Sequence, residues 1–223
     1  MANEYLTRTP TSSGNRSVFT WAGWVKISDS ISAATSIFGS FFGGSSRYTS
    51  LSFNSSSQLQ FFTGDYDVIN SSTPYQTWFI TDRKFRDFGS WIHIMLIYDT
   101  SDPIGDDRCK IYVNGSKVEI GTRTATASLG DVGFFNTTIP HYLGTWSDPA
   151  NNGGQYAKGE MFDVFLVDGQ ALTPDVFGFY KDGDGYMSSG NTQATDFKPG
   201  QWSPRLPKSI KYTINRSGGF GVN

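Results

Sequence analysis

The stretch WIHIMLIYDTSDPIGDDRCKIYVNGSKVEI, residues 91–120, predicts the fold of the chain. It opens with a run of strand-forming residues, 91–99, that is apolar on both faces, which is typical of a strand inside a sheet. After a polar loop, CKIYVNGSKVEI predicts a β-hairpin, because Asn-Gly is the preferred pair for a two-residue type I′ turn. The stretch therefore indicates antiparallel β structure.

The position of the Asn-Gly pair also predicts the register of the hairpin. With this pair as the loop, 108–113 pairs with 116–121, and Lys110 lies opposite Glu119. One face of the hairpin is then apolar and is expected to face a core; its residues are Cys109, Ile111, Val113, Val118 and Ile120. The inward position favours a buried small hydrophobic residue over a reactive thiol at Cys109.

The composition of the chain is that of a turn-rich β protein, with 25 glycines, 16% aromatic and 17% charged residues. At 223 residues one sandwich buries a sizeable core, and no linker divides the chain. We therefore expect a single domain over 1–223, with a loop-rich segment over about 181–223. A net charge of −2 without a basic run argues against nucleic-acid binding. No apolar run approaches the ~18 residues of a membrane span, so we expect no membrane insertion.

Short apolar segments between turn residues predict about a dozen strands, a pattern typical of a sandwich or barrel. The strongest segments beyond the opening stretch are Ser17–Ser28 and Gly159–Asp168, which both alternate in polarity. Thr122–Ser128 is weaker, and we expect it at a sheet edge. A Thr-Pro pair opens the one helix that the pattern predicts, over 173–180, with the threonine as its N-cap.

Several motifs occur in an order that resembles the laminin-G-like, concanavalin-A-like jelly-roll domains. They are YLTRTP at 5–10, FTWAGWVKIS at 19–28, FRDFGSWIHIMLIYDT at 85–100, KIYVNG at 110–115, HYLGTW at 141–146 and GEMFDVFLVDGQALTP at 159–174. The resemblance covers nearly the whole chain and implies an all-β, two-sheet antiparallel jelly-roll sandwich. It also implies that Trp24 and Trp91 are core aromatics and that Asp168-Gly169 is a turn.

More narrowly, the chain looks like the version of this domain in structural proteins of marine phages and other aquatic viruses. That resemblance implies a non-enzymatic domain on a virion surface, tail or capsid, or otherwise an extracellular one. Two functions remain open: binding of host-surface glycans during attachment, and a purely structural role as a decoration, spike or capsid-linking protein. In either case other virion proteins or sister subunits are the expected partners.

A glycoside hydrolase of the same fold is disfavoured. Such enzymes place two carboxylates across the scissile bond, in this fold in a strand pattern resembling E-x-D-x-x-E. The comparable strand here offers Glu160 and Asp163 but lacks the second glutamate, and residues three apart lie on opposite faces of a regular strand. The two histidines, His93 and His141, suggest no catalytic triad, and with one cysteine a zinc site is not expected.

Calcium is the candidate metal, because related laminin-G-like and pentraxin domains often hold it at a loop edge. Carboxylates crowd one loop and suit a hard cation; they belong to Asp99, Asp102, Asp106 and Asp107. The favoured alternative is an ordinary acidic β loop in which Asp99 caps a turn.

The long loop from Trp146 to Tyr156 is the candidate glycan site, because an indole face and planar polar groups suit a sugar ring and its hydroxyls. Its predicted binding residues are Trp146, Asp148, Asn151, Asn152, Gln155 and Tyr156. An equally favoured alternative is a solvated loop with Trp146 tucked into the core. The pairs Phe41-Phe42, Phe61-Phe62 and Phe134-Phe135 each direct one ring outward if they lie in strands, which points to an interface.

Asparagine heads an N-x-S/T triplet at six positions: Asn15, Asn54, Asn70, Asn114, Asn136 and Asn215. Because Asn, Ser and Thr are ordinary residues of exposed β turns, we interpret these asparagines as turn residues and not as glycosylation sites.

Overall fold

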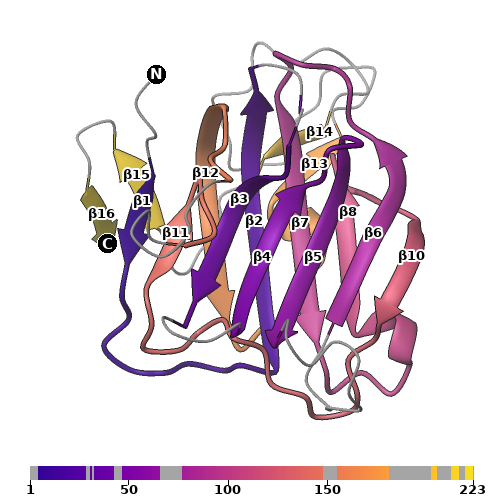
Figure 1. Ribbon diagram of the computed structural model, residues 1–223, viewed down its shortest axis with the longest axis vertical. Coiled ribbons are helices and arrows are strands. Elements are labelled where there is room, and N and C mark those ends of the chain that lie inside the picture. Colours follow the sequence, from indigo (N-terminus) through magenta and orange to yellow (C-terminus); the bar gives the residue numbers. More distant parts are fainter. Residues whose placement is uncertain are drawn as a thin grey trace.

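Strands with alternating apolar residues form two antiparallel sheets that face each other (Figure 1). The computed structural model describes residues 5–28, 31, 33–42, 47–65, 77–147, 155–180, 202–204, 212–215 and 219–222. The expected all-β, two-sheet antiparallel sandwich is confirmed. Among the described residues, no helix has the length and apolar character needed to cross a membrane.

The larger sheet has seven strands. In spatial order they are β1 (Leu6–Arg8), β11 (His141–Leu143), β3 (Thr35–Phe41), β4 (Arg47–Phe53), β5 (Gln58–Asp65), β6 (Thr77–Lys84) and β10 (Ile120–Ala125). The weak strand expected over 122–128 is β10, and it lies at a sheet edge as predicted. The sequence pattern also predicts a strand over 66–70, and these residues lie outside the described part of the chain.

The smaller sheet has five strands, with β7 at its centre, as the apolar run over 91–99 predicts. Their order is β12 (Gly159–Asp168), β2 (Val18–Ile27), β7 (Ile92–Asp99), β8 (Cys109–Val113) and β9 (Ser116–Lys117). Two further two-stranded ladders follow: β13 (Gly178–Tyr180) with β14 (Trp202–Pro204), and β15 (Tyr212–Asn215) with β16 (Gly219–Val222). Short 3-10 turns occur at η2 (Gly105–Asp107) and η4 (Pro174–Val176).

The main core lies between the two sheets. Strand β2 packs against apolar residues on both of its faces. On one face, Phe19, Trp21 and Val25 belong to the main core cluster. The alternate residues Ala22 and Trp24 belong to a second buried cluster, which also contains Phe177 after η4. The sheet is therefore buried on both faces at this strand, which explains why β2 is apolar at nearly every position.

The hairpin at Asn114-Gly115 forms as predicted, but its strands part sooner than expected. Val113 pairs with Ser116 and Tyr112 with Lys117, and the Val118 N–H still donates to the Ile111 carbonyl. The predicted opposition of Lys110 and Glu119 is wrong. The Glu119 carbonyl instead accepts a hydrogen bond from the Asp82 N–H, at 3.0 Å, in the other sheet.

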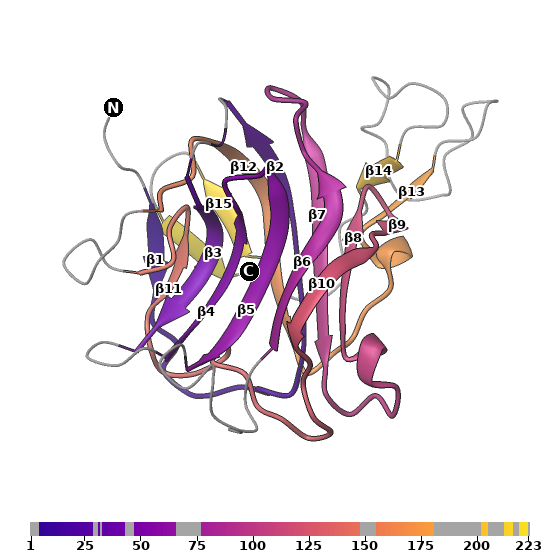
Figure 2. The same cartoon turned by 45° about the vertical axis from the view of Figure 1, so that its right-hand side comes forward.

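The reason is that one continuous segment serves both sheets. After β9 the chain passes to the seven-stranded sheet and pairs with β6 as β10 (Figure 2). Lys110 finds its charge partners in the acidic loop, at 3.6 Å from Asp102 and 3.9 Å from Asp107. The inward face of the hairpin is nevertheless as predicted, because Cys109, Ile111, Val113 and Val118 are buried in the main core and Ile120 packs against it.

Two further expectations are wrong. The helix predicted over 173–180 is a single 3-10 turn followed by strand β13. The Thr173 hydroxyl bonds the Asp175 carboxylate and caps no backbone N–H.

Trp91 is not a core residue: it precedes the ladder of β7, is 40% exposed and lies against the Lys26 ammonium, 5.1 Å from the ring centre. Trp24 is buried as expected.

Candidate functional site

The outer face of the seven-stranded sheet carries a shallow groove across β4, β5 and β6. Along β4, Leu51 and Phe53 point into the core, so Ser50 and Ser52 face outward. The register places Ser50 beside Phe62 and Ser52 beside Gln60. The groove has a volume of about 80 Å³; the residues that line it are Tyr48, Ser50, Ser52, Gln60, Phe62, Trp78, Trp146 and Gln155.

A continuous row of aromatic rings borders this groove. The Trp146 ring centre lies 5.2 Å from that of Phe41 and 5.0 Å from that of Tyr48, both edge-on. Tyr48 lies 4.4 Å from Phe62, which lies 6.2 Å from Trp78. The row thus crosses from β3 to β6 and presents aromatic surface beside polar side chains.

Trp146 reaches the row because the chain after β11 folds back over β3. A Cβ atom at Gly39 would lie only 2.5 Å from the Trp146 Cα, so the close approach depends on a glycine at this position. The Gly144 N–H donates to the Ile37 carbonyl at 3.1 Å, and the Ser36 N–H donates to the Gln155 carbonyl at 2.9 Å. The two ends of the predicted glycan loop are therefore attached to β3.

Hydrogen-bonding groups form the floor of the groove. Gln60 Nε2 donates to Ser52 Oγ at 3.0 Å, and the hydroxyls of Ser36 and Ser50 lie 3.1 Å apart. The Trp146 Nε1–H is buried and has no hydrogen-bond partner among the described residues. Amides and hydroxyls together offer both donors and acceptors, and none of the described side chains that line the groove is formally charged.

The structure gathers part of the predicted glycan site here. Trp146 and Gln155 line the groove, whereas Tyr156 forms an isolated bridge with Ser36 and has its ring 6.4 Å from that of Tyr5. The remaining predicted residues, Asp148, Asn151 and Asn152, lie outside the described residues. Trp146 is half-buried and packs on the outer sheet face, so it is not tucked into the core between the sheets.

Sequence reasoning missed the sheet residues of the groove. One signal was available in the Phe61-Phe62 pair: Phe61 faces the core and Phe62 faces outward, as expected. Phe62 is nevertheless only 5% exposed, because Tyr48 and Trp78 lie against it. The outward ring of this pair is therefore part of the groove wall and not an open apolar patch.

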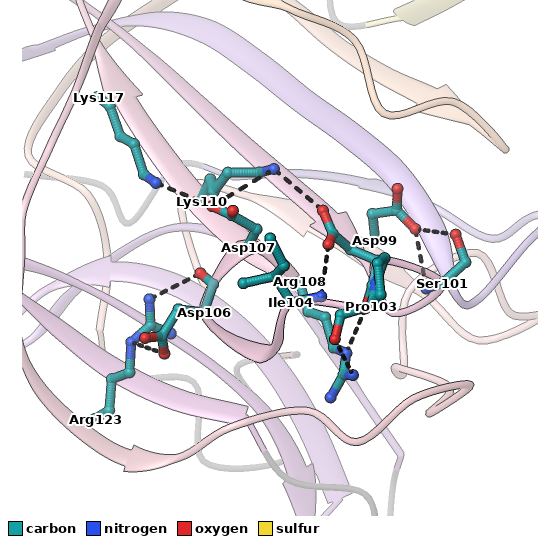
Figure 3. Close-up of polar contacts among 11 residues, drawn as sticks. Asp99, Ser101, Pro103, Ile104, Asp106, Asp107, Arg108, Lys110, Lys117 and Arg123 are labelled. Carbon is teal, nitrogen blue, oxygen red and sulfur yellow. Dashed lines mark hydrogen bonds and ion pairs between the residues drawn. The ribbon is translucent and has the colours of Figure 1, made fainter.

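The four aspartates proposed for calcium each bond a different partner, and Figure 3 labels three of them, Asp99, Asp106 and Asp107. Asp99 accepts hydrogen bonds from the N–H and hydroxyl of Ser101, and Asp102 accepts one from the Ile104 N–H. These bonds are turn caps of the kind named as the alternative for Asp99.

The other two carboxylates of this loop form ion pairs. Asp106 lies 3.3 Å from the Arg123 guanidinium, and Asp107 lies 3.0 Å from the Lys117 ammonium (Figure 3). The Lys117 hydrogen bond, with the charge of Lys110, lowers the pKa of Asp107. Among the described residues no group of three or more acidic, histidine or cysteine side chains has a metal-binding arrangement. The four aspartates therefore do not fit a calcium site as the chain is folded.

The two carboxylates considered for catalysis, Glu160 and Asp163, have different structural roles. Glu160 pairs with the Lys26 ammonium at 2.7 Å. Asp163 lies at a register shift between Phe162 and Phe165, with φ at +47°, and burial raises the pKa of its carboxyl group. Glu160 is thus a surface ion-pair residue, and Asp163 is the residue with positive φ in a β-bulge.

Both histidines are buried. His93 packs edge-on against Trp24, with ring centres 5.4 Å apart, and burial lowers its pKa to about 3. Burial also lowers the pKa of His141 to about 4. The Cys109 thiol is buried, which raises its pKa. Histidines that remain neutral and inside the fold are poor candidates for a solvent-accessible catalytic base.

The fold is of the lectin and carbohydrate-binding type. The chain belongs to the Concanavalin A-like lectin/glucanases superfamily, because the model of that laminin G family matches residues 2–176. No match to this chain was found among curated proteins.

Solved structures share the fold at low sequence identity. The CBM40 module of the Ruminococcus gnavus IT-sialidase is 13% identical, with 76% of this chain and 95% of that chain covered and a TM-score of 0.50. The same module bound to α2,3 sialyllactose is 14% identical, covering 78% and 96%, with a TM-score of 0.50. Domains LG4-5 of the mouse laminin α1 chain are 12% identical, covering 76% and 43%, with a TM-score of 0.50.

Proposed function

We propose that this protein is a non-enzymatic carbohydrate-binding domain that holds a glycan in the groove on the outer face of its seven-stranded sheet. The observation that carries the proposal is the aromatic row beside the serine and glutamine floor. A sugar ring has an apolar C–H face and a hydroxyl rim, so it matches an aromatic wall and a floor of uncharged donors and acceptors.

The groove favours a neutral glycan. Its lining consists of aromatic, serine and glutamine side chains, so among the described residues it offers no cation to pair with a sugar carboxylate. A bound sialic acid or uronic acid would bring its charge near the aromatic row without a counterion. We therefore expect neutral hexose or pentose chains to be preferred over sialylated ones.

A single groove of this size binds weakly, with a dissociation constant on the order of millimolar, or roughly −4 kcal/mol. Many copies on one particle turn such a site into firm attachment, because each further contact is intramolecular. A requirement for many copies agrees with the virion location that the sequence resemblance predicts. Both that location and the virion partner proteins stay predictions. Detection of the chain on purified virus particles tests that setting.

The test of binding uses a glycan array with protein displayed on multivalent beads, followed by titration with the best neutral oligosaccharide and with sialyllactose. Trp78→Ala and Trp146→Ala are each expected to weaken binding at least about tenfold, equivalent to roughly 1.4 kcal/mol. Trp91→Ala is the matched control, because Trp91 is an exposed tryptophan that lies outside the groove.

Equal losses in all three variants, or a preference for sialyllactose, would contradict the proposed site. If the multivalent protein binds no glycan while its melting transition is intact, the purely structural alternative holds.

A further inference from the structure

His141 is buried in β11, which lies between β1 and β3 (Figure 1), and two hydrogen bonds of opposite kind hold its ring. Nδ1 lies 2.8 Å from the Ile139 carbonyl, which can only accept, so Nδ1 carries the proton. Nε2 accepts from the Asn136 N–H at 3.1 Å, so Nε2 is unprotonated. The two backbone groups therefore require the neutral form of the ring.

Asn136 in turn holds the segment that precedes β2. Its carbonyl accepts from the Gly14 N–H at 2.8 Å, and its side-chain amide donates to the Asn15 carbonyl at 2.7 Å. The same amide donates at 3.1 Å to Asp168, whose carboxylate also accepts from the Asn15 N–H at 2.7 Å. One asparagine thus joins β11, the N-terminal segment and the end of β12.

The conformation of Asn136 depends on these contacts. Its φ of +54° is uncommon for a residue other than glycine, and such a backbone persists where the surrounding structure fixes it. The His141 ring that accepts its N–H packs near Phe38 and Phe135, with ring centres 6.2 Å and 6.1 Å away. Loss of the Nε2 acceptor would leave a buried N–H without a partner, which is unfavourable.

A half-open cleft of about 290 Å³ lies beside this network. Residues 10–14 line it, and so do Asn136, His141 and Asp168. Among the described residues, the hydrogen bonds that attach residues 10–15 to distant parts of the chain are those with Asn136 and Asp168. The position of this segment, and with it the width of the cleft, therefore depends on the Asn136 network.

The charged groups around His141 oppose its protonation. Arg8 lies opposite it in the pairing of β1 with β11, whereas its neighbour from β3, Ser40, is uncharged. The loop 133–140 carries no charged residue, and Asp168 bonds Asn136 instead of the ring. Burial, and to a smaller extent the charge of Arg8, lowers the pKa of His141 to about 4. The closed network thus resists a proton that an opened, solvated histidine would take up near pH 6.5.

We propose that His141 is an acid-sensitive latch, whose protonation removes the acceptor that holds Asn136, releases residues 10–15 and widens the cleft. The release ends at Arg16, because the bond from the Gly133 N–H to the Arg16 carbonyl, at 2.9 Å, involves neither latch residue.

The pH range of the latch follows from proton linkage. Above pH 6.5 neither the closed nor the opened form binds a proton at His141, so the latch is fully closed. As the pH falls from 6.5 toward 4, the opened form takes up a proton that the closed form does not. Opening therefore becomes more favourable by up to about tenfold per pH unit.

Native-state hydrogen exchange measures this opening at single amides. The experiment uses ¹⁵N-labelled protein between pH 7 and pH 4.5, with rates corrected for the intrinsic pH dependence of exchange. The Gly14 and Asn136 amides are expected to lose protection by up to about tenfold per pH unit below pH 6.5. Their protection is expected to stay below that of the Leu96 amide in the central strand β7, which opens only with the whole domain.

Two substitutions separate the latch from general acid destabilisation. His141→Gln keeps one donor and one acceptor but has no proton to gain, so the Gly14 amide is expected to lose its pH dependence. His93→Gln is the matched control, because it removes the other buried histidine, in the five-stranded sheet, and should leave that dependence in place. If His141→Gln fails to fold, the unmodified protein serves: the His141 ring and the Gly14 amide resonances are expected to titrate with one midpoint.

The latch is overturned if Gly14 protection does not change with pH, or if it changes only in parallel with that of Leu96. It is equally overturned if the pH dependence survives His141→Gln in a folded protein, or if the His141 ring and the Gly14 amide titrate with different midpoints.

Discussion

At the scale of single residues, three of the six asparagines of the N-x-S/T triplets act as turn residues, as their sequence context predicts: Asn15, Asn54 and Asn114. Asn215 instead ends strand β15, and Asn70 lies outside the described residues. Asn15 Oδ1 accepts from the N–H groups of Ser17 and Val18. Asn54 Oδ1 likewise accepts from the Ser56 N–H, whereas the Asn136 amide donates to the carbonyl of Asn15, which is distant in the sequence. A carboxamide offers both a donor and an acceptor, which explains why the chain uses asparagine where a loop returns to a strand.

Asn114 gives the first prediction at this scale. It has φ at +49° and accepts a hydrogen bond from the His93 N–H at 2.9 Å. Asn114→Ala loses that bond, and alanine is strained at this left-handed backbone angle. We therefore expect the free energy of unfolding to fall by about 2 kcal/mol. Asn114→Gly removes only the bond and should cost about half as much. Urea denaturation measures both, and equal losses would show that the backbone angle contributes nothing.

At the scale of elements, Gly39 and Trp146 couple β3 to the segment after β11. Gly39→Ala places a methyl group against the Trp146 backbone, so one of the two segments must move. We expect a loss of about 1–3 kcal/mol in stability, the usual result of overpacking, and weaker glycan binding because Trp146 is displaced. Gly105→Ala is the control, since its new Cβ would meet nothing closer than 3.8 Å. Similar melting temperatures for the two variants would contradict this coupling.

The elements also show what sequence alone can predict. The hairpin, the central strand β7 and strand β12 follow from local turn chemistry and from side-chain alternation, and they form as predicted. The outer groove does not follow in this way, because Tyr48, Phe62 and Trp78 lie on three strands and meet only through the pairing of those strands. The transfer of the chain to β10 was missed for the same reason: local pattern does not reveal which sheet a strand joins.

At the scale of the whole molecule, the two buried histidines predict how stability depends on pH. Their folded-state pKa values, about 3 for His93 and about 4 for His141, lie below the ordinary value of 6.5. Above pH 6.5 both are neutral in either state, so their contribution to stability is complete. Below pH 6.5 the unfolded chain takes up protons that the folded chain does not, and stability falls until the folded pKa is reached.

Each histidine contributes a slope of up to about 1.4 kcal/mol per pH unit in that window. We therefore expect the free energy of unfolding to decrease steadily from pH 6.5 to pH 4. Denaturation curves for the protein and for His141→Gln measure the slope, which the substitution should reduce. A stability that is flat across this range would contradict the buried, neutral state of the histidines.

Calcium supplies a second prediction for the molecule as a whole. Because the four loop aspartates already serve turns and ion pairs, the ion has no preformed ligand set there. Millimolar calcium is expected to leave the melting temperature unchanged, and Asp107→Asn should not alter this result. A rise in melting temperature that Asp107→Asn removes would restore the predicted calcium site.

The alternation along β4 and β5 has a consequence for how such a domain diversifies. Residues that line the proposed glycan groove and residues that hold the sheets together occupy separate positions of the same strands, so Ser50, Ser52 and Gln60 can be exchanged while Leu51 and Phe61 stay as they are. Natural variation, or a library restricted to those three codons, can therefore explore new sugar preferences without putting the fold at risk.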